Sequence, residues 1–319
     1  EAYDAIRNML SNLNDPYTRF LDPREFNQMR IDTSGELTGV GIQIMKEKES
    51  DDLIIISPIE GTPAYEAGIK ARDKILSIDN VSTKGMSIED AVKLIRGPRG
   101  TEVKLEIFRN GYSFYQSLSR ERIEIKTVTS KINKTKEGLL IGYVRIKQFN
   151  ANASREMKNT LKDLERREVS GYVLDLRSNP GGLLESSIDI SRQFIDKGVI
   201  VSTLSKDGLR EVKRGNGNAL TKKPLIVLVN EGSASASEIV SGAIRDNKRG
   251  KLVGMKTFGK GLVQSMRTLV DGSGLTVTVA KYLTPNGTDI NKFGITPDIV
   301  VKMNTNPLLP REIGTRRDR

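Results

Sequence analysis

A serine and a lysine in the last third of this 319-residue chain have the types and surroundings needed for acyl transfer. Ser235 lies in N-E-G-S-A-S-A-S-E-I-V (230–240), between an apolar run that predicts a buried strand and a pattern that predicts an amphipathic helix. A serine at such a strand-to-helix turn is exposed above a sheet, beside the amides of the helix N-terminus. Lys260 follows between two glycines, and Gln264 comes four residues later, on the same face if this segment is a strand.

The composition limits what this pair can do. The chain has no cysteine and no histidine. Thiolate nucleophiles, disulfides, Ser-His-Asp triads and metal sites built on cysteine or histidine are therefore excluded. If Ser235 is a nucleophile, its base must be a lysine or a carboxylate, and we expect Lys260. This chemistry needs no metal and no organic cofactor.

A lysine acts as a base only after it loses its proton. At an ordinary pKa near 10.4, roughly 0.04% of a lysine is neutral at pH 7, and desolvation can bring a catalytic lysine to about 7–8. Phe258, Leu262 and Val263 predict an apolar setting for Lys260. The uncharged Gln264 could orient the amine without stabilising its charged form.

Acyl transfer also needs two amide donors for the oxyanion of the tetrahedral intermediate. The amide of Ala236, directly after the serine, is one candidate. The other is expected from the glycine turn N-P-G-G (179–182), which follows an apolar strand. We expect Gly181 to be this donor, with Gly182 as the alternative.

The surrounding pattern predicts a multi-domain α/β protein. Residues 1–34 look helical, with a second helix at 22–31 that has Asp22 as N-cap and Pro23 in its first position. Residues 35–122 contain short strands and glycine turns, and residues 123–303 alternate strands with helices around a predicted central sheet. Residues 304–319 form a basic tail that we expect to be disordered.

The unit at 35–122 resembles a PDZ domain of the bacterial protease type. The run G-T-P-A…A-G-I…D-K-I-L-S-I-D carries the resemblance, despite Ala71-Arg72 and Asn80 where Pro-Gly and Gly are usual. The resemblance implies that Gly39, Val40, Gly41 and Ile42 form a loop whose amides bind the carboxylate of a peptide C-terminus. Arg96, at the end of the predicted groove helix, could complete that site.

Taken together, the motifs resemble the carboxyl-terminal processing (tail-specific) serine peptidases. They are D-P-Y-T-R-F-L-D-P (15–23), D-L-R-S-N-P-G-G (175–182), G-S-A-S-A-S-E, K-T-F-G-K-G-L-V-Q and D-G-S-G-L-T-V-T-V-A-K-Y-L-T-P-N-G (271–287). The resemblance implies a crotonase/ClpP-like core with an inserted PDZ domain, and an endopeptidase that cleaves near the C-termini of proteins. By motif position Ser235 is the nucleophile, Lys260 the base and Gln264 the orienting residue. Asn291 stands where a histidine is expected, so an active enzyme cannot need that histidine.

Within the family the chain looks most similar to cyanobacterial and chloroplast members, some of which mature the D1 subunit of photosystem II. The resemblance implies a location outside the cytoplasm, in the periplasm or the thylakoid lumen. No signal segment is seen at the start of this sequence.

Other interpretations remain open at this point. The chain could be a non-catalytic PDZ scaffold that binds C-terminal tails, or a relative of the crotonases with acyl-CoA chemistry. Ser233 could cap the helix, Ser237 could pack, and Glu238 could hold the helix start. Asp175 and Arg177 could form an internal ion pair that fixes the glycine turn.

The net charge of +11 bears on which kinds of partner the chain can bind. Lysines and arginines are interleaved with 40 acids, and no basic-aromatic platform is present, so we expect no nucleic-acid binding. Peripheral attraction to an anionic membrane surface or an acidic partner is compatible with the charge. The expected partners are protein substrates, recognised through their C-terminal tails.

Overall fold

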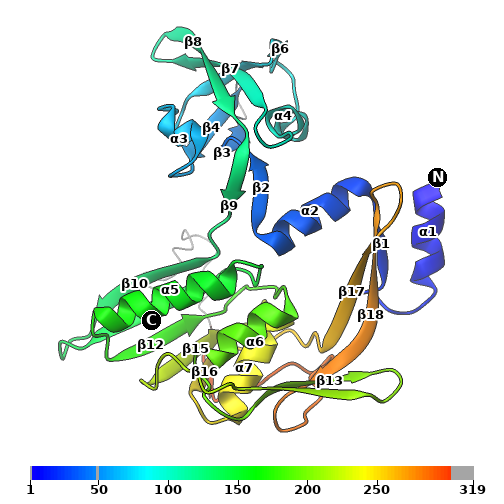
Figure 1. The fold of residues 1–319 in the computed structure, drawn as a ribbon, viewed down its shortest axis with the longest axis vertical. Coiled ribbons are helices and arrows are strands. Elements are labelled where there is room, and N and C mark those ends of the chain that lie inside the picture. Colours follow the sequence, from blue (N-terminus) through cyan, green and yellow to red (C-terminus); the bar gives the residue numbers. More distant parts are fainter. Residues whose placement is uncertain (1, 48–49, 303–319) are drawn as a thin grey trace. The chain divides into compact units, whose positions relative to one another are not determined.

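The computed structural model describes residues 2–47 and 50–302 (Figure 1). The chain forms two compact units: one holds the residues up to Gly35 and from Lys126 onward, and the other is Glu36–Ile125. The tail predicted at 304–319 lies outside the described residues. Within the described ranges, no helix has the length and apolar character needed to cross a membrane.

The larger unit contains a six-stranded sheet in which all neighbouring strands are parallel except β10 and β11. Its strands, in spatial order, are β10 (Val128–Lys134), β11 (Leu140–Ile146), β12 (Gly171–Asp175), β15 (Leu225–Val229), β16 (Lys251–Gly254) and β19 (Ile299–Val300). Three helices lie beside this sheet (Figure 1). Their apolar side chains form one core with those of β10, β11, β12, β15 and β16. The three helices are α5 (Ala153–Arg166), α6 (Leu184–Arg192) and α7 (Ala236–Asp246).

A second sheet of the same unit contains strands from both the N-terminal and the C-terminal parts of the sequence. It contains β1 (Arg19–Leu21), β18 (Gly274–Leu283), β13 (Val199–Ser205) and β14 (Arg210–Arg214), and β17 (Leu262–Thr268) also pairs with β18. The first residues were predicted to be helical, and α1 (Ala2–Ser11) and α2 (Pro23–Ser34) are helices. Between them, β1 forms a strand because Phe20 and Leu21 are buried against β18.

Helix α2 begins as its sequence predicted. Asp22 is the N-cap and accepts hydrogen bonds from the amides of Arg24 and Glu25. The Glu25 side chain accepts the amide of Asp22 in return, which completes a capping box. Gly35 ends the helix with a φ of 70° in the left-handed region, where glycine is favoured.

The smaller unit is rich in strands. A two-stranded sheet pairs β2 (Glu36–Gly39) with β9 (Glu121–Glu124). A six-stranded sheet contains β3 (Ile42–Lys46), β4 (Leu53–Pro58), β5 (Lys74–Ile78), β6 (Val81–Ser82), β7 (Glu102–Arg109) and β8 (Tyr112–Ser119). Helices α3 (Pro63–Glu66) and α4 (Ile88–Ile95) contribute Ala64, Ala91 and Ile95 to its core. The predicted α/β core with an inserted β-rich domain is confirmed.

Candidate active site

Ser235 lies in the turn between β15 and α7, in an unusual backbone conformation. Its φ of 54° and ψ of −113° fall in a region that non-glycine residues rarely occupy. Such strain persists where the surrounding structure imposes it, and it concentrates at functional sites. The side chain of Ser235 is partly exposed while Ala234 and Ala236 are buried, so the turn presents the serine outward.

Glu238, in the first turn of α7, connects the serine turn to the lysine loop. Its side chain is fully buried. Oε2 accepts the amides of Ser235 and Lys260, both at 2.9 Å. Oε1 accepts the amide of Gly259 at 2.7 Å and the hydroxyl of Thr257 at 2.6 Å. The expected role at the helix start is confirmed, whereas the link to Lys260 had no signal in the sequence.

Tyr282, on β18, joins the same two segments from another side. Its side chain is almost completely buried, with 1% exposure. The hydroxyl lies 3.1 Å from the carbonyl oxygen of Ser235 and within hydrogen-bond distance of the carbonyl oxygen of Lys260. No sequence motif had pointed to Tyr282. Two side chains far apart in the sequence therefore hold the backbones of Ser235 and Lys260 together.

The amine of Lys260 lies in a setting that favours its neutral form. Burial lowers the pKa of Lys260, the positive charge of Arg19 lowers it further, and Asp15 acts in the opposite direction. Nζ lies 4.6 Å from the centroid of the Tyr17 ring. Within the described part of the chain, no carboxylate oxygen comes within ion-pair distance of this amine. The direction of the pKa shift is the one that a lysine base requires.

Gln264 occupies a position that differs in part from the expectation. Strand β17 begins at Leu262, so Lys260 precedes the strand, and the expected shared strand face is wrong. A register shift between Val263 and Gln264 further breaks the alternation. The Nε2 of Gln264 is buried and has no hydrogen-bond partner among the described residues. A buried donor of this kind calls for a hydrogen-bond partner, and none of the described residues supplies one.

Gly181 lies against the serine turn. A Cβ added there would lie 2.8 Å from the Cβ of Ser235 and 3.0 Å from the amide nitrogen of Ala236. The φ of Gly181 is +103°, a value that glycine adopts easily and other residues rarely adopt. Both the backbone angle and the lack of space for a Cβ therefore require glycine here. The Gly181 amide itself donates to Oδ1 of Asn179 at 2.9 Å. The structure therefore brings Gly181 beside Ala236, and the Gly181 amide is hydrogen-bonded to the side chain of Asn179.

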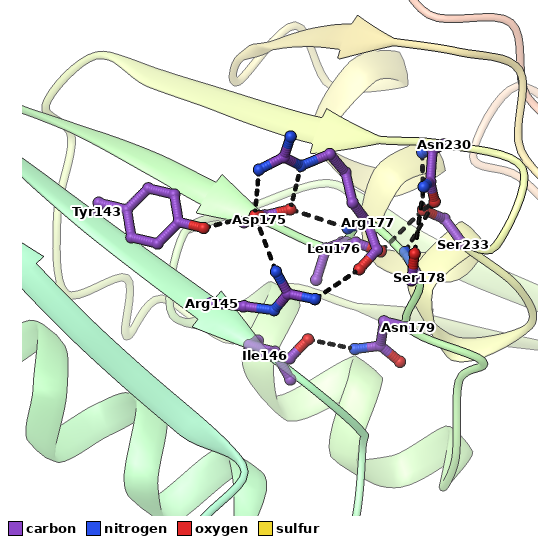
Figure 2. Close-up of polar contacts among 10 residues, drawn as sticks. All are labelled: Tyr143, Arg145, Ile146, Asp175, Leu176, Arg177, Ser178, Asn179, Asn230 and Ser233. Atoms are coloured by element: carbon purple, nitrogen blue, oxygen red, sulfur yellow. Dashed lines mark hydrogen bonds and ion pairs between the residues drawn. The ribbon is translucent and has the colours of Figure 1, made fainter. Parts of the chain in front are cut away.

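The loop that carries Gly181 is bonded to the serine turn at several points (Figure 2). Asn230 Oδ1 accepts the amide of Ser178 at 2.7 Å, and Ser233 Oγ donates to the carbonyl of Leu176 at 2.8 Å. Ser233 was expected to cap α7, but the cap is Ser235 and Ser233 connects the two loops instead.

Asn179 adds further hydrogen bonds between the glycine loop and the serine turn. Its carbonyl oxygen accepts the amide of Ala234 and the hydroxyl of Ser237, each at 3.0 Å. Its side chain donates to the carbonyl of Ile146 at 2.8 Å. The two loops that supply Ala236 and Gly181 therefore form one bonded unit.

Asp175 anchors the base of the glycine loop. It is fully buried, and Arg177 contacts both of its oxygens, with Nε at 2.9 Å and Nη2 at 2.8 Å (Figure 2). Tyr143 donates to it at 2.5 Å, and Arg145 lies 3.7 Å away. Burial alone would raise the pKa of Asp175, but hydrogen bonds from Arg177 and Tyr143 hold it below its usual value. The predicted Asp175–Arg177 ion pair is confirmed.

In the smaller unit, the predicted tail-binding residues form a compact loop between β2 and β3. Val40 is buried and its carbonyl accepts the amide of Ala64 at 2.9 Å. Gly41 has a φ of +82°, and a Cβ there would collide with Thr62. Arg96 caps the C-terminal end of α4, and its Cγ lies 3.9 Å from the Cβ position of Gly39. Strand β3 begins at Ile42 and lies at the edge of the six-stranded sheet, so this edge strand follows directly from the loop.

Within the described ranges, no group of three or more acidic side chains is arranged to hold a metal ion. The hydroxyl of Ser235 precedes the amide of Ala236, and Glu238 and Tyr282 connect the backbone of Ser235 to that of Lys260. Such groups fit covalent acyl transfer from a hydroxyl nucleophile.

Comparisons with known proteins agree with this geometry. Residues 140–301 match peptidase family S41, and residues 54–109 match the PDZ domain. The carboxyl-terminal-processing protease of Synechocystis sp. is 47% identical over 304 residues, which cover 95% of this chain and 71% of that protein. Carboxyl-terminal-processing peptidase 2, chloroplastic, of Arabidopsis thaliana is 43% identical over 308 residues, covering 93% of this chain and 60% of that protein.

A solved structure described as the photosystem II D1 C-terminal processing protease is similar over most of its length. It is 38% identical with a TM-score of 0.58, and the match covers 94% of this chain and 81% of that one. The fold and the site thus define a hydrolase of peptide bonds that carries a PDZ domain. The chain belongs to peptidase family S41, as a carboxyl-terminal-processing protease.

Proposed function

We propose that this protease cleaves its protein substrates with a Ser235–Lys260 dyad. The observation that carries the proposal is the shared anchoring of the two residues. Glu238 accepts both of their amides, and the Tyr282 hydroxyl lies within hydrogen-bond distance of both carbonyls. Structural lysines on surface loops do not require such a link to a strained serine turn. The lowered pKa of Lys260 supports the same assignment.

In the proposed reaction, Ser235 Oγ attacks the carbonyl carbon of the scissile peptide bond while neutral Lys260 takes its proton. The amides of Ala236 and Gly181 stabilise the oxyanion, and Gly181 exchanges Asn179 Oδ1 for this new acceptor. The C–N bond then breaks and Lys260 gives its proton to the leaving amine. Water, deprotonated by Lys260, hydrolyses the acyl ester and restores Ser235. Gln264, whose buried Nε2 lacks a partner among the described residues, orients the lysine.

The same proposal assigns the PDZ unit to the C-terminal tail of the substrate. The backbone of Gly39–Ile42 binds the terminal carboxylate, the tail pairs along β3, and Arg96 at the end of α4 adds a positive charge. The similarity to proteases of cyanobacteria and chloroplasts supports a location outside the cytoplasm, in the periplasm or thylakoid lumen. The likeness to a D1 processing protease suggests the D1 precursor as a substrate to test. The net positive charge supports peripheral contact with an anionic membrane.

The test uses a folded protein with an unstructured apolar C-terminal tail, incubated with purified enzyme and followed by mass spectrometry. Ser235→Ala and Lys260→Arg should abolish cleavage, because Arg cannot serve as a base near neutrality. Ser170→Ala and Lys256→Arg, at exposed positions, should cleave like the wild type. A substrate with an amidated C-terminus should be cleaved more slowly. Wild-type rates in Lys260→Arg would refute the base, and tail binding without cleavage by any form would favour a scaffold.

A further inference from the structure

The motif D-P-Y-T-R-F at 15–20 has no role in the reaction as described so far. This segment is attached to β18 at several points. Arg19 pairs with Thr276 in the strand register, the Tyr17 carbonyl accepts the Thr276 hydroxyl at 2.8 Å, and Thr18 Oγ1 accepts the Thr278 amide at 3.1 Å. Residues 15–20 are therefore a fixed part of the second sheet of the larger unit.

The same sheet carries the lysine loop. Strand β17 begins two residues after Lys260 and pairs with β18. The amide of Tyr282, on β18, donates to the carbonyl of Gly261 at 3.0 Å, directly after the lysine. Strand β18 thus holds residues 15–20 and the lysine loop together. Through this arrangement the ring of Tyr17 meets the Lys260 amine, with Nζ 4.6 Å from its centroid.

The charged and titratable groups of the segments that pack around Lys260 come from three elements. Residues 15–19 supply Arg19, which disfavours the ammonium, and Asp15, which favours it. The charge of Asp15 is bound locally, because it accepts the Tyr17 amide at 3.0 Å and the Thr18 hydroxyl at 2.7 Å. Helix α7 supplies Glu238, whose oxygens are occupied by backbone amides and Thr257. Strand β18 supplies the Tyr282 hydroxyl.

We propose that Tyr17 is a positioning residue for Lys260, so that the segment at 15–19 completes the active site. This inference rests on the proposed role of Lys260 as the base. The face of an aromatic ring attracts an ammonium group without accepting its proton in a hydrogen bond. A carboxylate at this place would hold the amine equally well but would retain the proton. The ring therefore holds Nζ while the proton moves to and from Ser235.

The test measures kcat and KM between pH 6 and 10.5 with a fluorogenic peptide that ends in a free apolar C-terminus. The variants are Tyr17→Phe, Tyr17→Leu and Arg19→Gln, with Arg24→Gln as the control for loss of an exposed positive charge on α2. Lys260→Arg is measured in parallel. Circular dichroism and thermal unfolding report whether each variant is folded.

Tyr17→Phe keeps the ring face and should resemble the wild type. Tyr17→Leu should lower kcat by about 10-fold or more with little change in KM, because the amine loses its position. The acid limb of its pH profile, where kcat rises as Lys260 loses its proton, should move to lower pH by about half a unit to one unit. The reason is that the ammonium loses a favourable contact with the ring. Arg19→Gln should move the limb in the opposite direction, up by about half a unit. Arg24→Gln should not move it.

Opposite shifts in the two variants would distinguish this role from a purely structural one. The inference is overturned if Tyr17→Leu behaves like Tyr17→Phe. Should Tyr17→Leu fail to fold, Tyr17→Met, which also lacks the ring face, is measured in its place. Activity surviving in Lys260→Arg would instead refute the proposed base, and the two failures are thereby separated.

Discussion

Asp175 and Glu238 are both fully buried carboxylates, and the chain satisfies them in different ways. Asp175 is paired with Arg177, has Arg145 nearby and accepts a hydrogen bond from Tyr143. Glu238 accepts its four hydrogen bonds from neutral groups, three of them backbone amides. An ion pair joins one side chain to another, whereas amide donors join the carboxylate directly to the backbone. Glu238 can therefore fix the positions of Ser235 and Lys260, while Asp175 fixes the strand that leads to the glycine loop.

The comparison predicts that breaking the ion pair has the largest effect on stability. Arg177→Met leaves Asp175 buried without its main partner, a change that typically costs about 3–5 kcal/mol. Urea unfolding at pH 7 should show this loss. The pKa of Asp175 is lowered in the folded state, so its contribution is present above the unfolded value near 3.9 and is lost as pH falls further. The gap between variant and wild type should thus narrow below about pH 4. A gap that is independent of pH would contradict the pairing.

Glu238→Gln should affect catalysis more than stability. The amide has one acceptor oxygen and one donor nitrogen, so it cannot accept hydrogen bonds on both sides as Glu238 does. The amides of Ser235 and Lys260, or the hydroxyl of Thr257 and the amide of Gly259, would lose their acceptor. A displacement of the dyad of about 1 Å can cost on the order of 100-fold in kcat. Steady-state kinetics on the tail substrate measure this, and a kcat within a few-fold of wild type would contradict the linking role.

Tyr143→Phe should have the smallest effect of the three. It removes one hydrogen bond to Asp175, worth about 1–2 kcal/mol, while the ion pair with Arg177 remains. The burial of Tyr143 and the neighbouring Asp175 raise the pKa of its phenol to about 12, so the group stays a donor throughout the working range. Urea midpoints of this variant and Arg177→Met should differ clearly. Equal losses would mean that the charge of Arg177 adds nothing.

Local patterns were sufficient to predict the turn that carries Ser235. The apolar run before Asn230 and the small residues around Ser235 predicted this turn, whereas Lys260 was expected in a strand with Gln264 and precedes that strand. Asp22 and Pro23 predicted the start of α2, because capping depends on neighbours in the sequence. The ion pair between Asp175 and Arg177 was also predicted from the sequence, because the two residues are only two positions apart.

Contacts between distant segments could not be predicted in this way. Tyr282 lies 47 positions from Ser235, and Tyr17 meets Lys260 only because β1 and β17 both pair with β18. Ser233 was assigned to the helix cap because the sequence shows its helix but not the neighbouring Leu176 carbonyl. The Gly181–Asn179 hydrogen bond is local, yet it depends on the shape of the turn rather than on residue type.

The central claim is that Ser235 is activated by Lys260 held in its neutral form. The most direct measurement is the pH dependence of kcat/KM for one defined cleavage, which reports the pKa of the essential base in the free enzyme. Because burial and Arg19 lower the pKa of Lys260, we expect a single acid limb with an apparent pKa below the ordinary value of lysine. Activity should rise with pH through that limb and then level off. A rate that does not change across the range, or a limb at the ordinary pKa of lysine, would contradict it.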